Sequence, residues 1–421
     1  MNKIFTNKQY LTNLSATLAA QLATAISILV LARVLVTNLG EEKFSLYGVV
    51  LNLIIVASVF DFSLNTTLVR RLILHPEKNE ESINTVFNFF LLVLLIGIPI
   101  YFFSFFWGGV QLRDNQWLMA VIVALIVAQN MLAVMFESIM QSVNQWQAGK
   151  IIRVFRTIAE TGLLYAVSAW GKLEYLLLVT VGVNMVYLVF LALFAKRQVS
   201  FTLQLGRLRF SSLYEQLKES FWYFQNTMAS VITFNFQIIL MSHFLSAAAM
   251  TIYLLVFRFF EILRTGLTNF AMLLFPSITA KQKEGNWAEI WQYYKKAWST
   301  VALIVLFSMT LVFVWGDDVF YYWSKNHSEQ ARHLFFGYGI YVGLLVVDHV
   351  NGVFLSALKF NRNTAIVSSL QCILLLFFTY ILIRNYGVYG AVYASLCSFI
   401  CTSLWYNPLH LWKSIRSLLV K

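Results

Sequence analysis

Two arginines and a glutamate lie in a stretch of the chain that is otherwise apolar, at about residues 251–275. Arg258 and Glu261 are three residues apart and share a helix face, with Arg264 at the edge of that face. Charged side chains are costly at membrane depth and tend to face a bundle interior or a wet cavity, and the planar guanidinium of Arg binds phosphate oxygens in pairs. The pattern predicts that these three residues line a ligand cavity. The alternative is that Glu261 only pairs with the two arginines and holds helices together.

Three other apolar stretches carry polar residues at helical spacing. Asp61 lies on one such stripe with Ser58 and Asn65. The remaining members of the predicted cavity are Arg33, Gln21, Asn226 and Gln237. A cavity between two helical bundles is the simplest arrangement that brings all these stripes together. Arg33 lies near a helix end, from which its side chain could instead extend to the membrane surface.

Three carboxylates are candidates for ion coupling: Asp348, Asp61 and Glu137. A carboxylate in an apolar span can exchange a proton or a cation near neutral pH. Asp348 is followed by His349. A helix-packing hydrogen bond with the backbone or with Asn351 explains the presence of these polar residues in the span equally well. For Glu137 the polar neighbours on its own helix favour a structural role. We expect no metal site and no bound cofactor, because the zinc and nucleotide motifs H-E-x-x-H and G-x-x-x-x-G-K-[ST] are missing.

The whole chain has 421 residues, of which 59% are hydrophobic and 12% are charged. A soluble domain has about 25% charged residues, so the composition excludes a water-soluble globular protein. About 12 spans of about 21 residues leave ~170 residues for loops and termini, too few for an appended enzyme domain. The net charge of +12 indicates membrane topology and affinity for anionic lipids, and argues against nucleic-acid binding.

Uncharged runs of 18 or more residues predict twelve transmembrane helices. The expected fold class is therefore an all-α polytopic membrane protein with two six-helix bundles. The spans cover about residues 14–36, 44–69, 83–106, 117–140, 151–170, 176–194, 221–245, 251–275, 301–315, 334–356, 364–383 and 388–411.

The Lys and Arg residues predict the orientation, because they favour short cytoplasmic loops. A cytoplasmic N-terminus assigns 22 of the 31 basic residues to the cytoplasm and six to the outside, with Arg33, Arg258 and Arg264 inside spans. Both termini are then expected to be cytoplasmic.

The chain is expected to divide near its midpoint. Residues 196–220 are basic and amphipathic, which predicts a linker on the cytoplasmic membrane surface. Six spans precede it in residues 1–195 and six follow in residues 221–421. Both halves then share one orientation, which is typical of bundles related by a pseudo-two-fold axis along the membrane normal.

Several motifs in the first two spans point to a known group. The first turn reads Leu39-Gly40-Glu41-Glu42 and leads into Phe44-Ser45-Leu46-Tyr47-Gly48, and the second span ends in Leu68-Val69-Arg70-Arg71. A weaker version of these motifs occurs in the second half and includes Tyr253, Arg258 and Phe275-Pro276-Ser277. These motifs resemble polysaccharide flippases of the Wzx type, in the multidrug/oligosaccharidyl-lipid/polysaccharide exporter (MOP) superfamily. Asp61-Phe62-Ser63 stands where many relatives have a glycine.

The resemblance implies a flippase rather than an enzyme. Its cargo would be an undecaprenyl-pyrophosphate-linked oligosaccharide, such as an O-antigen repeat unit, moved across the bacterial inner membrane by alternating access. A proton or sodium gradient would drive it, and its partners would be this cargo, membrane lipids, a polysaccharide polymerase and a chain-length regulator.

Two other functions stay open. An ion-coupled small-molecule exporter of the same superfamily would use Asp61 or Asp348 against a cationic drug. A polytopic polymerase or ligase would need a larger external loop than the spans leave.

Overall fold

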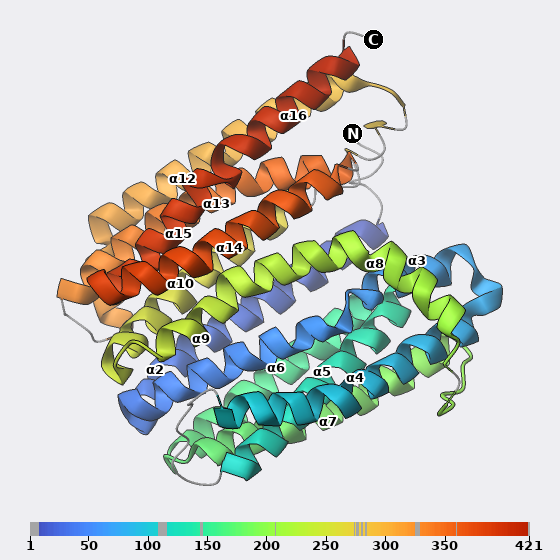
Figure 1. Cartoon of the computed structure of the whole chain (residues 1–421), viewed down its shortest axis with the longest axis horizontal. Helices are drawn as coiled ribbons and strands as arrows, with labels where there is room; N and C mark the ends of the chain where they lie inside the picture. The colour runs from blue at the N-terminus through green and yellow to red at the C-terminus, as the bar shows by residue number, and fades with distance from the viewer. Residues whose placement is uncertain are drawn as a thin grey trace. The chain divides into compact units, whose positions relative to one another are not determined.

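The structure, a computed structural model, describes residues 8–107, 116–143, 146–206, 208–272, 274, 278, 281–282, 284–324, 329–358 and 360–419. Across these residues the backbone is helical apart from turns and short connections, and it contains no strand. Within each half of the chain, long helices lie side by side (Figure 1). The chain is therefore all-α in its described part, as its composition predicts.

The chain forms two compact units, an N-terminal unit of Met1–Phe224 and a C-terminal unit of Gln225–Lys421. In the N-terminal unit α2 packs against α6, and α5 packs against α7. The helices of this unit are α2 (Lys8–Ser58), the 3-10 helix η1 (Val59–Asp61), α3 (Leu64–Leu74), the 3-10 helix η2 (Pro76–Lys78), α4 (Asn79–Trp107), α5 (Gln116–Ser142), α6 (Trp146–Ser168), α7 (Leu173–Gln198) and the first part of α8 (Phe210–Val231).

The C-terminal unit begins within α8. In it α13 packs against α10 and α12, and α14 packs against α15. Its other helices are the π-helix η3 (Ile232–Phe236), α9 (Gln237–Ser242), α10 (Ala247–Met272), α12 (Trp287–Ser324), α13 (Glu329–Ala357), α14 (Asn361–Tyr386), α15 (Tyr389–Cys401) and α16 (Ser403–Leu419).

Two backbone breaks divide the first hundred residues. Gly40 lies within α2 with φ 77° and ψ 168°, and it separates the first two predicted spans. The second break follows η1, where Phe62 and Ser63 both take the left-handed conformation, with φ 52° and 53°. Residues other than glycine rarely adopt this backbone conformation, because Cβ then approaches the following carbonyl oxygen. The second predicted span is therefore interrupted at Asp61.

The twelve predicted spans are largely helical, with turns inside the second at 62–63 and the last at Thr402, and the end of the eighth, beyond Met272, lies mainly outside the described residues, together with the Phe275-Pro276-Ser277 motif. Among the described residues, seven helical segments are long and apolar enough to cross a membrane by length and composition. One of these, Ala19–Asp61, contains most of the first predicted span and most of the second.

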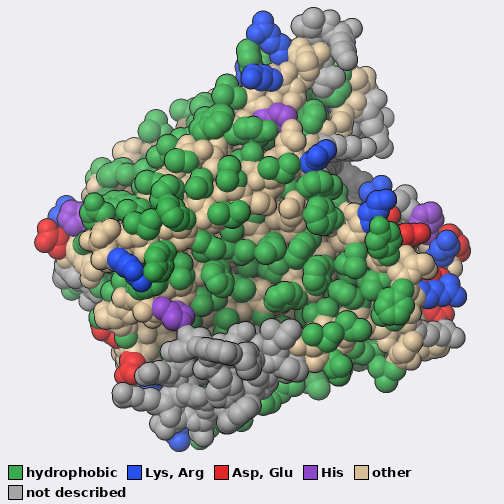
Figure 2. Space-filling model, in the orientation of Figure 1, with side chains coloured by type: hydrophobic (Ala, Val, Ile, Leu, Met, Phe, Trp, Pro, Cys, Tyr) green, Lys and Arg blue, Asp and Glu red, His purple; other side chains and the backbone are tan. Residues whose placement is uncertain are grey.

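The exposed surface is strongly apolar. Leu95, Phe155 and Ile373 are 77%, 68% and 65% exposed. Figure 2 shows hydrophobic side chains across the visible face, with charged side chains gathered mainly toward its margins. A monomeric soluble protein rarely exposes so much contiguous apolar surface. The chain is a multi-pass membrane protein.

The connection expected as a surface linker is held by specific hydrogen bonds. Asn84 on α4 donates to the Thr202 carbonyl (2.8 Å) and accepts from the Gln204 amide (2.7 Å). Asn88, one turn later, donates to the Gln204 carbonyl (2.8 Å) and accepts from the Gly206 amide (2.8 Å). Two asparagine side chains thus pair with alternate residues of an extended segment. Residues 196–220 therefore comprise the end of α7, this segment and the start of α8.

Candidate functional site

Helix α10 carries the charges that the sequence singles out. Arg258 Nη1 donates to Glu261 Oε2 at 2.7 Å, and both side chains are largely shielded, at 16% and 22% exposure. Arg264 lies elsewhere, with its guanidinium carbon 4.2 Å from the centroid of the Phe234 ring. No carboxylate of the described residues lies within ion-pair distance of Arg264. The two arginines therefore have different environments, one in an ion pair and one on an aromatic face.

A polar pocket of about 190 Å³ lies within the C-terminal unit, among α8, η3, α13, α14, α15 and α16. The residues predicted from sequence that line it are Asn226 and Asp348, together with His349. Phe234 also lines it, so the ring that contacts Arg264 forms part of the pocket wall. Two groups predicted from distant spans, Asn226 and Asp348, thus share one pocket.

Amide groups hold Asp348 in place. Asn351 Nδ2 donates to Asp348 Oδ1 at 2.9 Å, and Asn407 Nδ2 donates to Asp348 Oδ2 at 2.8 Å. Tyr294 in turn donates to Asn351 Oδ1 at 2.8 Å. Asn407 Oδ1 and His349 Nε2 are buried without a hydrogen-bond partner among the described residues. The pocket is therefore lined by a carboxylate, an amide and an imidazole, a set of groups that suits a proton or a small cation.

In the N-terminal unit, Asp61 caps the break in the second span. Its Oδ1 accepts from the Ser63 amide (2.7 Å), and its Oδ2 accepts from Asn65 Nδ2 (2.6 Å). Asp61 and Asn65, predicted to share a stripe, are therefore in direct contact.

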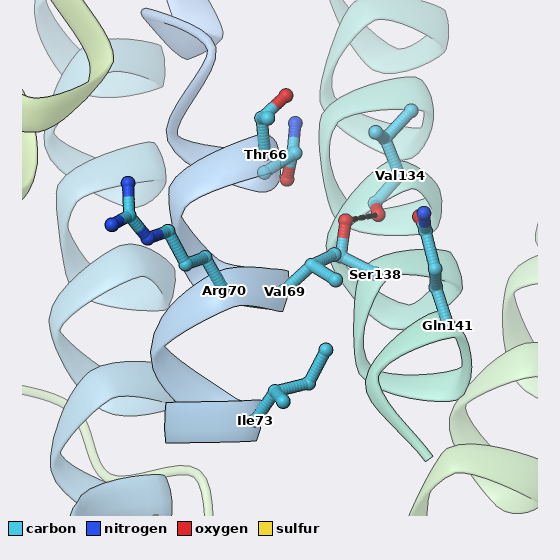
Figure 3. A pocket seen from close by; sticks show the side chains of 8 residues that line it. Thr66, Val69, Arg70, Ile73, Val134, Ser138 and Gln141 are labelled. Atoms are coloured by element: carbon cyan, nitrogen blue, oxygen red, sulfur yellow. Dashed lines mark hydrogen bonds between the residues drawn. The ribbon is translucent and has the colours of Figure 1, made fainter. Parts of the chain in front are cut away.

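Asn65 also lines a pocket of about 570 Å³ between α3 and α5. Val69 and Ile73 on α3 lie opposite Ser138 and Gln141 on α5 (Figure 3). The other lining residues are Thr66, Arg70 and Val134. This volume falls within the ~300–1,000 Å³ typical of small-molecule sites.

Glu137 belongs to a polar cluster on three helices. It accepts a short hydrogen bond from the Tyr187 hydroxyl on α7, and Arg153 on α6 lies 3.9 Å away. Arg156 lies over the Tyr187 ring at 5.0 Å and 3.7 Å from Glu160. The cluster ties α5, α6 and α7 together, and Glu137 lines neither of the two pockets described above.

The remaining predicted residues lie outside these pockets. Gln237 is buried and bonds to Thr379, Ser395 and the Ala391 carbonyl, so it joins α9 to α14 and α15. Gln21 is half-buried and Arg33 exposed, both on α2. In the described part of the chain no group of three or more His, Cys, Asp or Glu side chains is placed to hold a metal ion.

Several lining residues escaped the sequence reasoning. Asn407, Gln371 and Ser403 line the pocket of Asp348, and Ser403 and Asn407 are four residues apart in the last predicted span. That spacing places them on one helix face, a signal of the same kind as the stripe of Asp61. Arg70 was named within the Leu68-Val69-Arg70-Arg71 motif and was not predicted to line a pocket.

The fold is shared with solved transporters. The lipid II flippase MurJ, in an inward closed conformation, matches with a TM-score of 0.74 and 13% identity over 96% of this chain and 87% of that chain. An inward-facing multidrug resistance MATE family transporter of the MOP superfamily matches with a TM-score of 0.71 and 13% identity over 94% and 98% of the two chains. The Vibrio cholerae MATE transporter VcmN in its bent form matches with a TM-score of 0.66 and 13% identity, over 97% of each chain.

Sequence comparison gives the family. A search of curated proteins finds no match. The family model described as "Polysaccharide biosynthesis protein" matches residues 10–282, well over half of the chain. With a MOP-type transporter fold and this match, the chain belongs to the polysaccharide biosynthesis protein family.

Proposed function

We propose that this protein is a flippase that moves an undecaprenyl-pyrophosphate-linked oligosaccharide, of the O-antigen type, across the bacterial inner membrane. Twelve spans in two six-helix bundles with cytoplasmic termini would enclose the cargo site. A polysaccharide polymerase and a chain-length regulator would act on the delivered repeat units.

The observation that carries the proposal is the environment of Arg264. An arginine in an apolar helix is costly without an anionic partner, and the described residues supply Arg264 with an aromatic face and no carboxylate within ion-pair distance. A pyrophosphate would provide the missing anion, and the guanidinium fork matches its oxygens. Membership of a polysaccharide biosynthesis family supports a cargo of this chemistry.

We assign ion coupling to the pocket of Asp348. A carboxylate held by two amides, next to an unpaired imidazole nitrogen, can take up and release a proton or sodium ion as the transporter changes conformation. Asp61 is the second candidate for this role. Glu137 is a weaker candidate for ion coupling, since its carboxylate already accepts a hydrogen bond from the Tyr187 hydroxyl.

A deletion strain tests the proposal. Cells that lack this protein should accumulate lipid-linked repeat units on the cytoplasmic leaflet and lose surface polysaccharide, and the wild-type gene should restore it. The Arg264→Gln variant should insert normally and fail to restore it. Wild-type polysaccharide with Arg264→Gln would refute the site, and unchanged polysaccharide in the deletion strain would refute the function.

The second candidate function is export of small molecules, which the structural similarity to MATE transporters supports. It would need a carboxylate facing a cationic drug, and Asp348 supplies one. Drug accumulation in the same deletion strain separates the two functions, because a flippase predicts no change. Reporter fusions that reveal a large periplasmic domain would instead favour a polymerase or ligase.

A further inference from the structure

Arg264 is held by an aromatic ring and keeps its hydrogen-bond donors free. Its guanidinium carbon lies 4.2 Å from the centroid of the Phe234 ring, well inside the ~6 Å over which a ring face attracts a cation. Arg264 forms no hydrogen bond or ion pair with any other residue that the structure describes. Arg258, earlier on α10, instead donates to Glu261. The Phe234 ring thus attracts the charge of Arg264 without taking up its N–H groups as a carboxylate would.

The segment that carries Phe234 is an unusual one. Phe234 lies in the π-helix η3, where the Gln237 amide donates to the Ile232 carbonyl five residues earlier. Thr233 and Asn235, on either side of Phe234, are both buried, so the backbone beneath the ring is held in place by packing. Single π-turns inside helices are rare and occur frequently at functional sites.

The position of a guanidinium matters because phosphate binding by arginine is directional. The planar fork binds two oxygens only in a narrow range of orientations. A free arginine side chain loses much conformational freedom when it takes up one of these orientations. A side chain that already lies against a ring loses less on binding, and its affinity for the anion is higher for that reason.

We propose that Phe234 is a positioning residue for the cargo: its ring holds Arg264 in the orientation in which the guanidinium binds the pyrophosphate. The inference rests on the proposed function and adds a second residue to its anion site. Phe234 acts on the cargo only through Arg264. Its contribution to pyrophosphate binding must therefore vanish when the guanidinium is absent.

Binding of farnesyl pyrophosphate to the full-length protein in lipid nanodiscs tests this role, with farnesol as the probe that lacks the anion. Phe234→Leu should weaken binding of farnesyl pyrophosphate about three- to tenfold and change binding of farnesol less than about twofold. Phe234→Tyr keeps an aromatic face and should bind both probes as the wild type does. Phe234→Met, with a more adaptable apolar side chain, replaces Phe234→Leu if that variant does not fold.

A double-mutant cycle separates positioning from a structural role. Arg264→Gln should weaken binding of farnesyl pyrophosphate, and addition of Phe234→Leu to that variant should weaken it no further. Phe236→Leu is the matched control, because Phe236 belongs to the same π-helix and does not line the pocket of Asp348. It should leave both affinities unchanged.

Two results would refute the positioning role while the flippase proposal stands. One is wild-type affinity for farnesyl pyrophosphate in Phe234→Leu, and the other is an equal loss from Phe234→Leu with and without Arg264. If Arg264→Gln binds farnesyl pyrophosphate as tightly as the wild type, the anion site of the proposed function is wrong, and the role of Phe234 fails with it. If the wild-type protein does not bind farnesyl pyrophosphate, both proposals fail.

Discussion

Asp348 differs from an ordinary helix-packing carboxylate because its two oxygens accept from Asn351 and Asn407 inside a pocket. An asparagine in its place keeps the size of the side chain but cannot exchange a proton or balance a cation. We expect Asp348→Asn to fold and to reduce translocation to the rate measured without an ion gradient. Asp318→Asn, at an exposed carboxylate on α12, should retain gradient dependence. Full gradient dependence in Asp348→Asn would remove this residue from the coupling mechanism.

The ion pair on α10 gives a second test with single residues. Removal of Arg258 leaves Glu261 shielded and without its partner, which we expect to cost about 1–3 kcal/mol of stability. Arg258→Gln should therefore lower the thermal unfolding temperature, and the double variant Arg258→Gln with Glu261→Gln should recover most of the loss. A double variant as unstable as Arg258→Gln would show that the pair does not hold the helix.

Sequence reasoning found residues whose polarity stands out in an apolar span, and it could not find their partners. Asp348 and Asn226 were predicted from different spans, and they line one pocket. The Asp348 to Asn407 bond depends on how α13 packs against α16, which no local pattern encodes. Gln237 stands out in the same way but satisfies its amide in helix packing.

Among the elements, the break between η1 and α3 carries backbone strain. Ser63 has φ 53°, a conformation that costs an L-residue about 1–2 kcal/mol and glycine almost nothing. Ser63→Gly should therefore raise the free energy of unfolding by about 0.5–1 kcal/mol, and Ser63→Val should lower it. Thermal unfolding in nanodiscs measures both variants. Stabilisation by valine would contradict the left-handed conformation.

The segment of residues 202–206 gives a prediction for a connection. Asn84 and Asn88 contribute four hydrogen bonds to it, each worth about 1 kcal/mol net. Leucine at both positions should speed hydrogen exchange at the Gln204 and Gly206 amides by at least about tenfold. Thr85→Val is the control, because the Thr85 hydroxyl bonds only within its own helix. Unchanged exchange in the double variant would mean that other contacts hold the segment.

Helical periodicity predicted the elements well, because the predicted spans are largely helical in the described residues. It did not predict the break at Phe62 and Ser63, since neither residue type favours a left-handed conformation. Amphipathicity predicted residues 196–220 as a surface linker, but it reports only a polar face and could not reveal the two asparagines that bind this segment. Those asparagines lie more than a hundred residues away on α4.

At the scale of the whole molecule, we propose that the protein moves a lipid-linked sugar by alternating access and takes energy from an ion gradient. Composition and charge predicted a multi-pass membrane protein, and the family match supports a role in polysaccharide synthesis. Composition cannot specify the cargo, because in our proposal its phosphates are recognised by an individual group, Arg264.

Transport by the purified protein tests this account most directly. Vesicles that contain the protein and a labelled undecaprenyl-pyrophosphate-linked disaccharide would be given a proton or sodium gradient. The exposed sugar would then be measured with a membrane-impermeant glycosidase. We expect gradient-dependent movement of the sugar across the bilayer, and we expect Arg264→Gln to abolish it. Movement no faster than in protein-free vesicles, under either gradient, would contradict it.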